Sequence, residues 1–437
     1  MSRTIARRFL NIAVLSCILA VAACSGGSAP APTPAPTASR PVAVVNAATP
    51  TVAQVASGPT EEPTKAPKPT RTPKPSQPEP TDTPTPLPPP PPKKPARLNT
   101  PEYGAQAFLW WRPELAERDL LEIKNMGFTW VKQGFGWRDI ELEKGKFDWS
   151  RTDFVVYTTN RYGEGKLDLL IRVDHQPEWA RKGCSMQGPP TNMKDFGDFL
   201  SAVASRYKGR IRAYQIWNEP NLAREWCDQR PSPQQYAQML KTAYTAIKAA
   251  DPDALVISAG MSPTGTNNEQ AMPDDVFLDQ LYQGMGGKSD GYFDLMGVHA
   301  AGFKAAPEVS PAEAAADKAK YGGERFFTFR RVEDLRKIME KYGDTNKQVA
   351  VLEFGWTSDQ IHPDYAWHAV TEEQKADYLV RAYQYAKQNY QPWMGVMSLI
   401  YICDPDWKPE NEQYWWCITN PDGTPRPAYN ALKAMPK

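Results

Sequence analysis

The sequence predicts an α/β protein, a single (β/α)8 TIM barrel preceded by a disordered linker rich in proline and threonine, on three observations. Short runs rich in Val, Ile, Leu and aromatic residues recur eight times, and helix-period segments with start signals lie between them. From Trp110 to Ile400 these runs repeat about every 41 residues, which suits βα units of roughly 30 residues or more. A doubly wound sheet is the rival architecture, but no GxGxxG or phosphate-binding loop follows the first run.

Five helices and eight strands are expected, and one of the helices has a clear start signal. Ser232 before Pro233 is a helix start, because serine caps the free N–H groups and proline suits the first turn. In such a barrel, functional groups lie where strands end and loops begin. The other expected helices cover residues 113–126, 192–207, 327–342 and 371–389, and the strand-like runs cover 104–110, 129–137, 167–173, 213–217, 255–259, 294–298, 349–352 and 395–400.

Composition separates the first 97 residues from the rest. Of the 43 prolines, 22 lie between Ser28 and Arg97, whereas all 14 tryptophans follow residue 97. A segment so poor in large apolar residues cannot form a core. We therefore expect residues 25–97 to be a disordered tether and residues 98–437 to be the barrel domain. A proline-rich docking ligand at Pro86 to Pro92 remains open.

The N-terminus has the features of an export signal. Arg3, Arg7 and Arg8 precede the apolar run 9–23, which is too short for a permanent membrane span. The sequence that ends at Cys24 resembles the bacterial lipobox, which implies a signal peptide over 1–24 and lipidation of Cys24. Cleavage as an ordinary signal peptide is the alternative, and both the general and the twin-arginine export routes stay open. We expect an exported protein at the cell envelope or surface that contacts the membrane only through this lipid anchor.

Charge and cysteine content narrow the function. The whole chain has a formal net charge of +1, but residues 98–437 hold 40 Lys and Arg against 46 Asp and Glu, which argues against nucleic-acid binding. No CxxC pair suggests a zinc site, so we expect no metal. We also expect no cofactor, and a monomer. Of the six cysteines, Cys17 and Cys24 lie in the predicted signal peptide. In an oxidising compartment we expect the other four to form disulfides. Their positions in the loops predict the pairs Cys184–Cys227 and Cys403–Cys417.

Two glutamates stand at the ends of opposite strands. Glu219 follows the fourth run within Trp217-Asn218-Glu219-Pro220, and Glu353 ends the seventh run before Phe354-Gly355-Trp356. A charge at the end of an apolar strand is costly unless it is solvated or used. Strands four and seven face each other across an eight-stranded barrel, so the two carboxylates can flank one bond.

These two motifs resemble those of glycoside hydrolase clan A, with a leaning towards family 39, the xylosidase and iduronidase group, and towards family 5. The resemblance covers residues 98–437. It implies that Glu219 is the general acid/base, Glu353 the nucleophile and Asn218 the partner of the sugar 2-hydroxyl. Retaining hydrolysis needs one protonated and one ionised carboxyl about 5 to 5.5 Å apart.

Aromatic and polar residues near the strand ends suit a carbohydrate. We expect two or three of Trp137, Trp356 and Trp407 to stack on sugar rings, with a core position as the alternative for each. Lys132 and His175 are candidate polar contacts. The clan's usual tyrosine after strand six is missing, because the chain continues His299-Ala300-Ala301; His299 is then expected to take part of the polar role. Tyr401 stands where a sugar-binding tryptophan is common after strand eight.

The leading hypothesis is a retaining glycoside hydrolase that acts on a β-linked poly- or oligosaccharide. A catalytically inactive carbohydrate-binding lipoprotein and a transglycosylase that remodels envelope polysaccharide are the alternatives. The sequence leaves the sugar, the linkage and endo or exo action open.

Overall fold

The computed structural model describes residues 89–437 except 111 and 185–186. The predicted signal peptide, Cys24 and residues 25–88 of the predicted tether lie outside the described residues, so their interpretation stays a prediction. Among the described residues, none of the helices has both the length and the apolar character that a membrane span requires.

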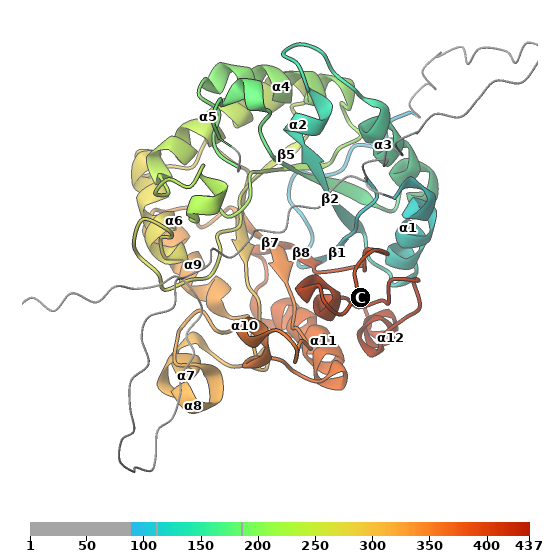
Figure 1. Ribbon diagram of the computed structural model, residues 1–437, viewed down its shortest axis with the longest axis vertical. Coiled ribbons are helices and arrows are strands. Elements are labelled where there is room, and N and C mark those ends of the chain that lie inside the picture. The colour runs from blue at the N-terminus through green and yellow to red at the C-terminus, as the bar shows by residue number, and fades with distance from the viewer. Residues whose placement is uncertain (1–88, 111, 185–186) are drawn as a thin grey trace, which may run out of the picture. The chain divides into compact units, whose positions relative to one another are not determined.

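Eight parallel strands close into a barrel in chain order, and β1 pairs with both β2 and β8 (Figure 1). Each strand lies within a few residues of its predicted run, so the barrel prediction is confirmed. The strands are β1 (Glu102–Gln106), β2 (Trp130–Gly136), β3 (Asp168–Asp174), β4 (Ala213–Ile216), β5 (Leu255–Ser258), β6 (Leu295–His299), β7 (Gln348–Phe354) and β8 (Met394–Leu399).

Helices surround the barrel (Figure 1). The predicted cap of α5 is present: the side chain of Ser232 accepts a hydrogen bond from the backbone N–H of Gln235, and Pro233 is the first helical residue. The main helices are α1 (Ala116–Asn125), α3 (Ser150–Gly163), α4 (Met193–Arg206), α5 (Pro233–Ala250), α6 (Asp274–Gly284), α9 (Arg331–Lys341), α11 (Glu372–Asn389) and α12 (Pro427–Ala434). Shorter helices are α2 (Trp137–Ile140), α7 (Pro311–Ala316), α8 (Lys318–Tyr321), α10 (Pro363–Ala366) and the 3-10 turns η1 (Pro113–Leu115), η2 (Glu178–Ala180), η3 (Ala223–Glu225) and η4 (Glu412–Trp416).

The barrel interior changes character along its axis. Leu98, Trp130 and Leu170 belong to a small apolar cluster contributed by several strands. Because side chains alternate along a strand, Lys132 follows Trp130 and Arg172 follows Leu170 on the same inward face. The interior is therefore apolar towards the N-terminal ends of the strands and charged towards their C-terminal ends, where a site is expected.

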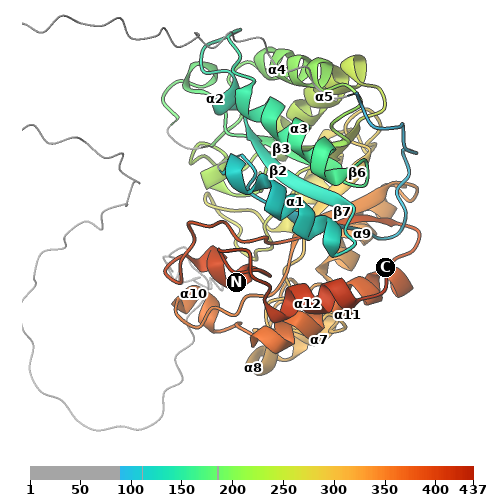
Figure 2. The same ribbon diagram turned by 90° about the vertical axis from the view of Figure 1, so that its right-hand side faces the viewer.

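The segment before β1 contacts the N-terminal end of the barrel. Lys94 pairs with Asp168 at the start of β3 at 2.8 Å, and the backbone N–H of Leu98 donates to Oε1 of Gln348 at the start of β7 at 2.9 Å. Figure 2 shows this blue segment at the end of the barrel away from α2 and α10. Residues 94–98 thus lie opposite the C-terminal mouth.

Candidate active site

Glu219 lies in a loop whose backbone is tightly held. Trp217 and Glu219 have φ angles of 70° and 40°, in the left-handed region that non-glycine residues rarely adopt. The N–H of Glu219 donates to the carbonyl of Gly260 after β5 at 3.1 Å. The buried Asn221 amide donates to the carbonyls of Ser262 and Met272, both at 2.9 Å. Strained backbone that the surroundings hold in place is typical of functional sites.

Glu353 stands on β7 against the buried cation Lys132 and the half-buried cation Arg172. Nζ of Lys132 on β2 lies 2.9 Å from Oε1 of Glu353, and Nη1 of Arg172 on β3 lies 3.6 Å from the same oxygen. Burial alone would raise the pKa of Glu353, but the charges of Lys132, His299 and Arg172 outweigh it and lower that pKa to about 2. Glu353 is therefore ionised at neutral pH, as a nucleophile must be.

His299 links the two carboxylates. Its Nδ1 lies 3.2 Å from Oε1 of Glu219 and 3.9 Å from Oε2 of Glu353. These two oxygens are thus at most roughly 7 Å apart, a range that includes the spacing of about 5 to 5.5 Å used in retaining hydrolysis. The predicted approach of Glu219 and Glu353 across the barrel is present in the structure.

Glu219 has a second cationic partner. Nη2 of Arg224, on η3, lies 2.6 Å from Oε2 of Glu219. Burial would raise the pKa of Glu219, but the hydrogen bond and charge of His299 together with the charge of Arg224 lower it. Both carboxylates of the site are therefore held ionised in this state.

A third carboxyl group lies nearby on η3. Glu225 is buried, and its Oε2 has no hydrogen-bond partner among the described residues. Burial, with the negative charges of Glu219 and Asp174, raises the pKa of Glu225 to about 8. Glu225 is therefore a neutral acid near pH 7.

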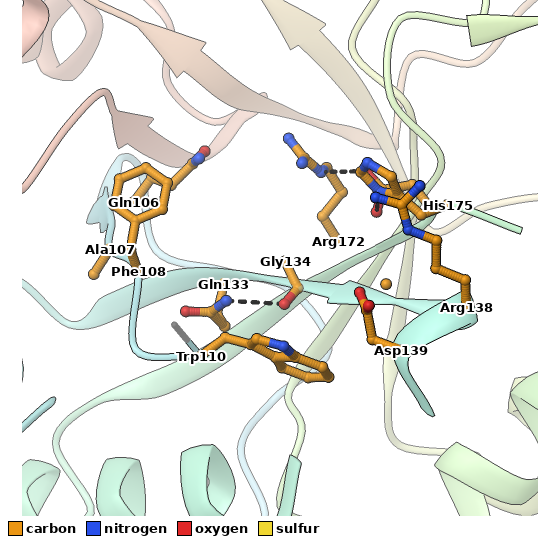
Figure 3. A pocket seen from close by; sticks show the side chains of 12 residues that line it. Gln106, Ala107, Phe108, Trp110, Gln133, Gly134, Arg138, Asp139, Arg172 and His175 are labelled. Atoms are coloured by element: carbon orange, nitrogen blue, oxygen red, sulfur yellow. Dashed lines mark hydrogen bonds and ion pairs between the residues drawn. The ribbon is translucent and has the colours of Figure 1, made fainter. Parts of the chain in front are cut away.

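A pocket opens beside Arg172, between the C-terminal ends of β1, β2 and β3 (Figure 3). Its cavity volume is about 80 Å³, smaller than the roughly 300 to 1,000 Å³ of typical small-ligand pockets. Among its lining side chains, His175 has Nδ1 2.7 Å from Oδ1 of Asp174, and Nε of Arg172 lies 2.7 Å from Oδ2 of the same carboxylate. The other lining residues are Gln106, Ala107, Phe108, Trp110, Gln133, Gly134, Gly136, Arg138 and Asp139.

Three half-buried rings meet at one side of this pocket. Phe108 after β1 contacts Trp407 and Tyr401 after β8, with ring centroids 4.7 and 5.6 Å apart, and Tyr401 contacts Trp407 at 5.1 Å. Burial and the charge of Glu353 raise the pKa of Tyr401 well above its usual value. The structure thus brings the predicted contacts Tyr401 and Trp407 together, and Tyr401 lies within the electrostatic range of Glu353.

Asn218 directly precedes Glu219 in the loop after β4. It is half-buried, and its Oδ1 accepts a hydrogen bond from Nε2 of Gln215 at 3.4 Å. The role that the resemblance implies for Asn218 stays a prediction.

Three expected substrate contacts need correction. Trp137 and Trp356 are both 0% exposed: the ring of Trp137 stacks on Phe199, and Nε1 of Trp356 donates to the carbonyl of Ala305. Lys132 is 1% exposed and pairs with Glu353, so it contacts the nucleophile rather than the surface of the pocket. A position near a strand end does not reveal whether the side chain points into the mouth or into the core.

Sequence reasoning missed Arg172, Arg224 and Glu225. Arg172 could have been found as a single charged residue inside the otherwise mostly apolar run 167–173. Arg224 and Glu225 follow the Asn-Glu-Pro motif closely, but nothing local shows that the chain turns back towards Glu219.

The predicted cysteine pairs are confirmed. Cys184 and Cys227 form one disulfide with Cα atoms 5.6 Å apart, and Cys403 and Cys417 form the other with Cα atoms 5.2 Å apart. The first ties the loop after β3 to the chain that follows η3. Within residues 89–437, apart from those left undescribed, no group of three or more His, Cys, Asp or Glu side chains is arranged to hold a metal ion.

Comparisons with known proteins support the same family. Residues 92–283 match the model of the cellulases of glycoside hydrolase family 5. Endo-1,4-beta-xylanase 3 of Hypocrea jecorina is 24% identical over 135 residues, which cover 30% of this chain and 37% of the xylanase. The match thus spans little more than a third of that relative.

Solved structures share the fold. A family 39 glycoside hydrolase from the gut symbiont Bacteroides cellulosilyticus superimposes with a TM-score of 0.56 and 19% identity, over 77% of this chain and 63% of that chain. GH5_18 from Streptomyces cattleya, in complex with GlcNAc, superimposes with a TM-score of 0.55 and 13% identity, over 77% and 79%. For a monomeric beta-xylosidase from Caulobacter crescentus the TM-score is 0.52 and the identity 18%, over 77% and 69%. The family 5 match supports the resemblance to glycoside hydrolase clan A, and the solved structures show that the described part of this chain shares their (β/α)8 barrel fold.

Proposed function

We propose that the protein is a retaining glycoside hydrolase in which Glu353 is the nucleophile and Glu219 the general acid/base. The observation that carries this proposal is the shared contact of the two glutamates with His299, together with the cations Lys132 and Arg172, which keep Glu353 ionised. The family 5 match and the structural neighbours support it.

In the first step, an oxygen of Glu353 attacks the anomeric carbon while the glycosidic C–O bond breaks. The electron pair of that bond goes to the leaving oxygen, which takes a proton from Glu219. In the second step, ionised Glu219 accepts a proton from water, and the water oxygen displaces Glu353 from the anomeric carbon. Two inversions return the original anomeric configuration. Asn218 beside Glu219 is suited to hold the 2-hydroxyl.

For the substrate we propose a β-linked poly- or oligosaccharide. The pocket beside Arg172 offers both donors and acceptors to sugar hydroxyls, and the rings of Phe108, Tyr401 and Trp407 offer apolar faces. Xylan and β-xylosides deserve the first test, because the named relatives include a xylanase and a xylosidase.

The deciding experiment is product analysis with aryl β-glycosides, xylan and other plant and microbial polysaccharides. Released monosaccharide indicates exo action, and a ladder of oligomers indicates endo action. Proton NMR of the first product should show retained configuration. Inverted product would overturn the mechanism, and inactivity on every glycoside would favour the carbohydrate-binding alternative. Transfer products that dominate over hydrolysis would favour the transglycosylase alternative.

We also propose that the protein is exported and anchored through a lipid on Cys24. Residues 94–98 lie at the end of the barrel opposite the active site, so an anchored tether attached there leaves the mouth free for a polymer. Palmitate labelling of the full chain should be lost in Cys24→Ala. Labelling that persists in this variant would contradict the anchor.

A further inference from the structure

The two carboxylate oxygens of Glu219 have different partners: His299 contacts Oε1, and Arg224 contacts Oε2. Nη2 of Arg224 lies 2.6 Å from Oε2, while Nδ1 of His299 lies 3.2 Å from Oε1. The Arg224 side chain is 61% exposed, whereas that of Glu219 is 13% exposed. An exposed cation at the rim therefore covers a nearly buried carboxylate.

This contact conflicts with the acid half of the proposed mechanism. A general acid must carry a proton and must reach the leaving oxygen within about 3 Å. In the structure Oε2 of Glu219 accepts a hydrogen bond from the guanidinium of Arg224, which remains a cation, and Oε1 faces Nδ1 of His299. The arrangement suits the ionised base of the second step but opposes the protonated acid of the first.

The other groups around Glu219 do not provide the missing proton position. The negative charge of Glu353 on β7 raises the pKa of Glu219, and His299 on β6 lowers it. Glu225 on η3 is a neutral acid near pH 7. Tyr401 after β8 also lies within the field of Glu219. Of the cations that act on Glu219, Arg224 is the exposed one, so it is the one that a ligand can displace.

Arg224 also has acidic surroundings to which it can move. Its Nε lies 3.7 Å from Oε1 of Glu225, and its charge acts on Glu412 on η4 and on Tyr365 on α10. These groups stand around the same rim. Departure from Glu219 therefore leaves the guanidinium beside carboxyl and hydroxyl oxygens that can accept its hydrogen bonds.

We propose that Arg224 is a positioning residue that holds Glu219 as the ionised base until the leaving-group half of the substrate displaces it. This inference rests on the proposed glycosidase mechanism. It makes protonation of the leaving oxygen depend on an occupied leaving-group site, so that the acid forms only when a sugar is present to accept its proton.

The proton balance follows directly. Displacement of Arg224 lets Glu219 take one proton from solvent, and this proton moves to the leaving oxygen as the C–O electron pair is released. Glu219 is then ionised again and accepts the proton of the attacking water. It releases this proton to solvent when Arg224 returns, which restores the starting state. A leaving group that needs no protonation, such as dinitrophenolate, bypasses the first part of this cycle.

The first test needs no substrate. The full chain is labelled with carbon-13 at the glutamate side-chain carboxyls, and Glu219→Gln identifies the Glu219 signal. In Arg224→Ala the titration of Glu219 should move to higher pH, and Arg224→Lys should restore part of the original value. Arg230→Ala is the matched control, because Arg230 is 53% exposed and pairs with Glu269. An unchanged titration in Arg224→Ala would overturn the inference.

The second test compares leaving groups. For hydrolysis of xylobiose, the ratio of kcat/KM at about pH 8 to that at about pH 6 should rise about three- to tenfold in Arg224→Ala, because one opposing charge has gone. The same ratio for dinitrophenyl β-xyloside should change less than about twofold. An equal change for both substrates would contradict a role through Glu219. If the wild type cleaves neither xyloside, the proposed substrate fails, while the titration still decides the role of Arg224.

Discussion

The two halves of the active site hold their glutamates in different ways. Glu353 contacts Lys132 and Arg172, which come from the neighbouring strands β2 and β3 and are held within the barrel. Glu219 pairs with Arg224 on η3, in the loop after β4, and the Arg224 side chain is largely exposed. In the proposed mechanism, fixed charges thus surround the nucleophile, and a charge that the substrate can displace covers the acid/base.

This difference matches the chemistry of the two groups. A nucleophile keeps one protonation state until it reacts, so permanent buried cations serve it well. An acid/base has to alternate between two states, and a cation that cannot leave would prevent one of them. The barrel wall provides permanent partners, whereas a rim loop provides partners that a substrate can replace.

The strongest test of this contrast is Glu353→Ala. Without the carboxylate no covalent intermediate forms, so turnover should fall by roughly 10⁴-fold or more. Initial rates with dinitrophenyl and natural glycosides measure the loss. Glu340→Ala on the surface of α9 is the control. Near-normal activity of Glu353→Ala would remove Glu353 from the mechanism.

Glu219→Ala should depend on the leaving group. Natural glycosides should lose about 10² to 10⁴ in rate, because their leaving oxygen needs a proton. Activated aryl glycosides should keep a fast first step and accumulate the glycosyl-enzyme. Added azide should restore turnover and yield a β-glycosyl azide, detected by NMR. No azide product, together with equal losses on both substrate types, would refute the acid/base assignment.

Lys132→Met should show that the nucleophile needs its buried cation. Loss of this charge raises the pKa of Glu353 from about 2 towards its ordinary value, so the carboxylate protonates at higher pH. The acid limb of kcat/KM should therefore move to higher pH, with a loss of roughly 10-fold or more at low pH. Lys144→Met, at an exposed pair with Asp195, should leave the profile unchanged. An unshifted acid limb in Lys132→Met would contradict the contrast.

Removing the disulfides tests the loops at the rim rather than the strands of the barrel. Replacing Cys184 and Cys227 by serine should lower the free energy of unfolding by about 4 kcal/mol, and replacing Cys403 and Cys417 by about 3 kcal/mol, if loop closure dominates. Denaturant unfolding measures both. Because Cys227 follows η3, the first pair should also alter the pH profile of xylobiose hydrolysis. The reverse order of stability would argue against loop closure.

Glu225→Gln should change the pH dependence of stability. Glu225 ionises near its ordinary pKa in the unfolded chain but at about 8 in the fold. Between these values the native state binds the extra proton, so stability falls with rising pH by up to about 1.4 kcal/mol per unit. The glutamine variant should lack this slope in thermal unfolding from about pH 5 to pH 8. An identical slope in both proteins would mean that Glu225 is ionised in the fold.

Much of the scaffold followed from local sequence patterns. Each apolar run became a strand because a buried parallel strand needs continuous apolar residues, and Ser232 with Pro233 began α5 because their chemistry suits a helix start. Glu219 and Glu353 could be found from their positions at the ends of opposite strands. The cysteine pairing followed from the order of the loops around the barrel.

Side-chain direction and contacts between distant segments required the tertiary structure. Trp137 and Trp356 stand at strand ends in the sequence, but packing against helices and loops turns both rings into the core. Lys132 and Glu353 are 221 residues apart, and only closure of the barrel makes them an ion pair. Arg224 meets Glu219 because the chain turns sharply after β4. Period and composition are local properties, whereas the charge state of a buried group depends on every neighbour that the fold brings within a few ångströms.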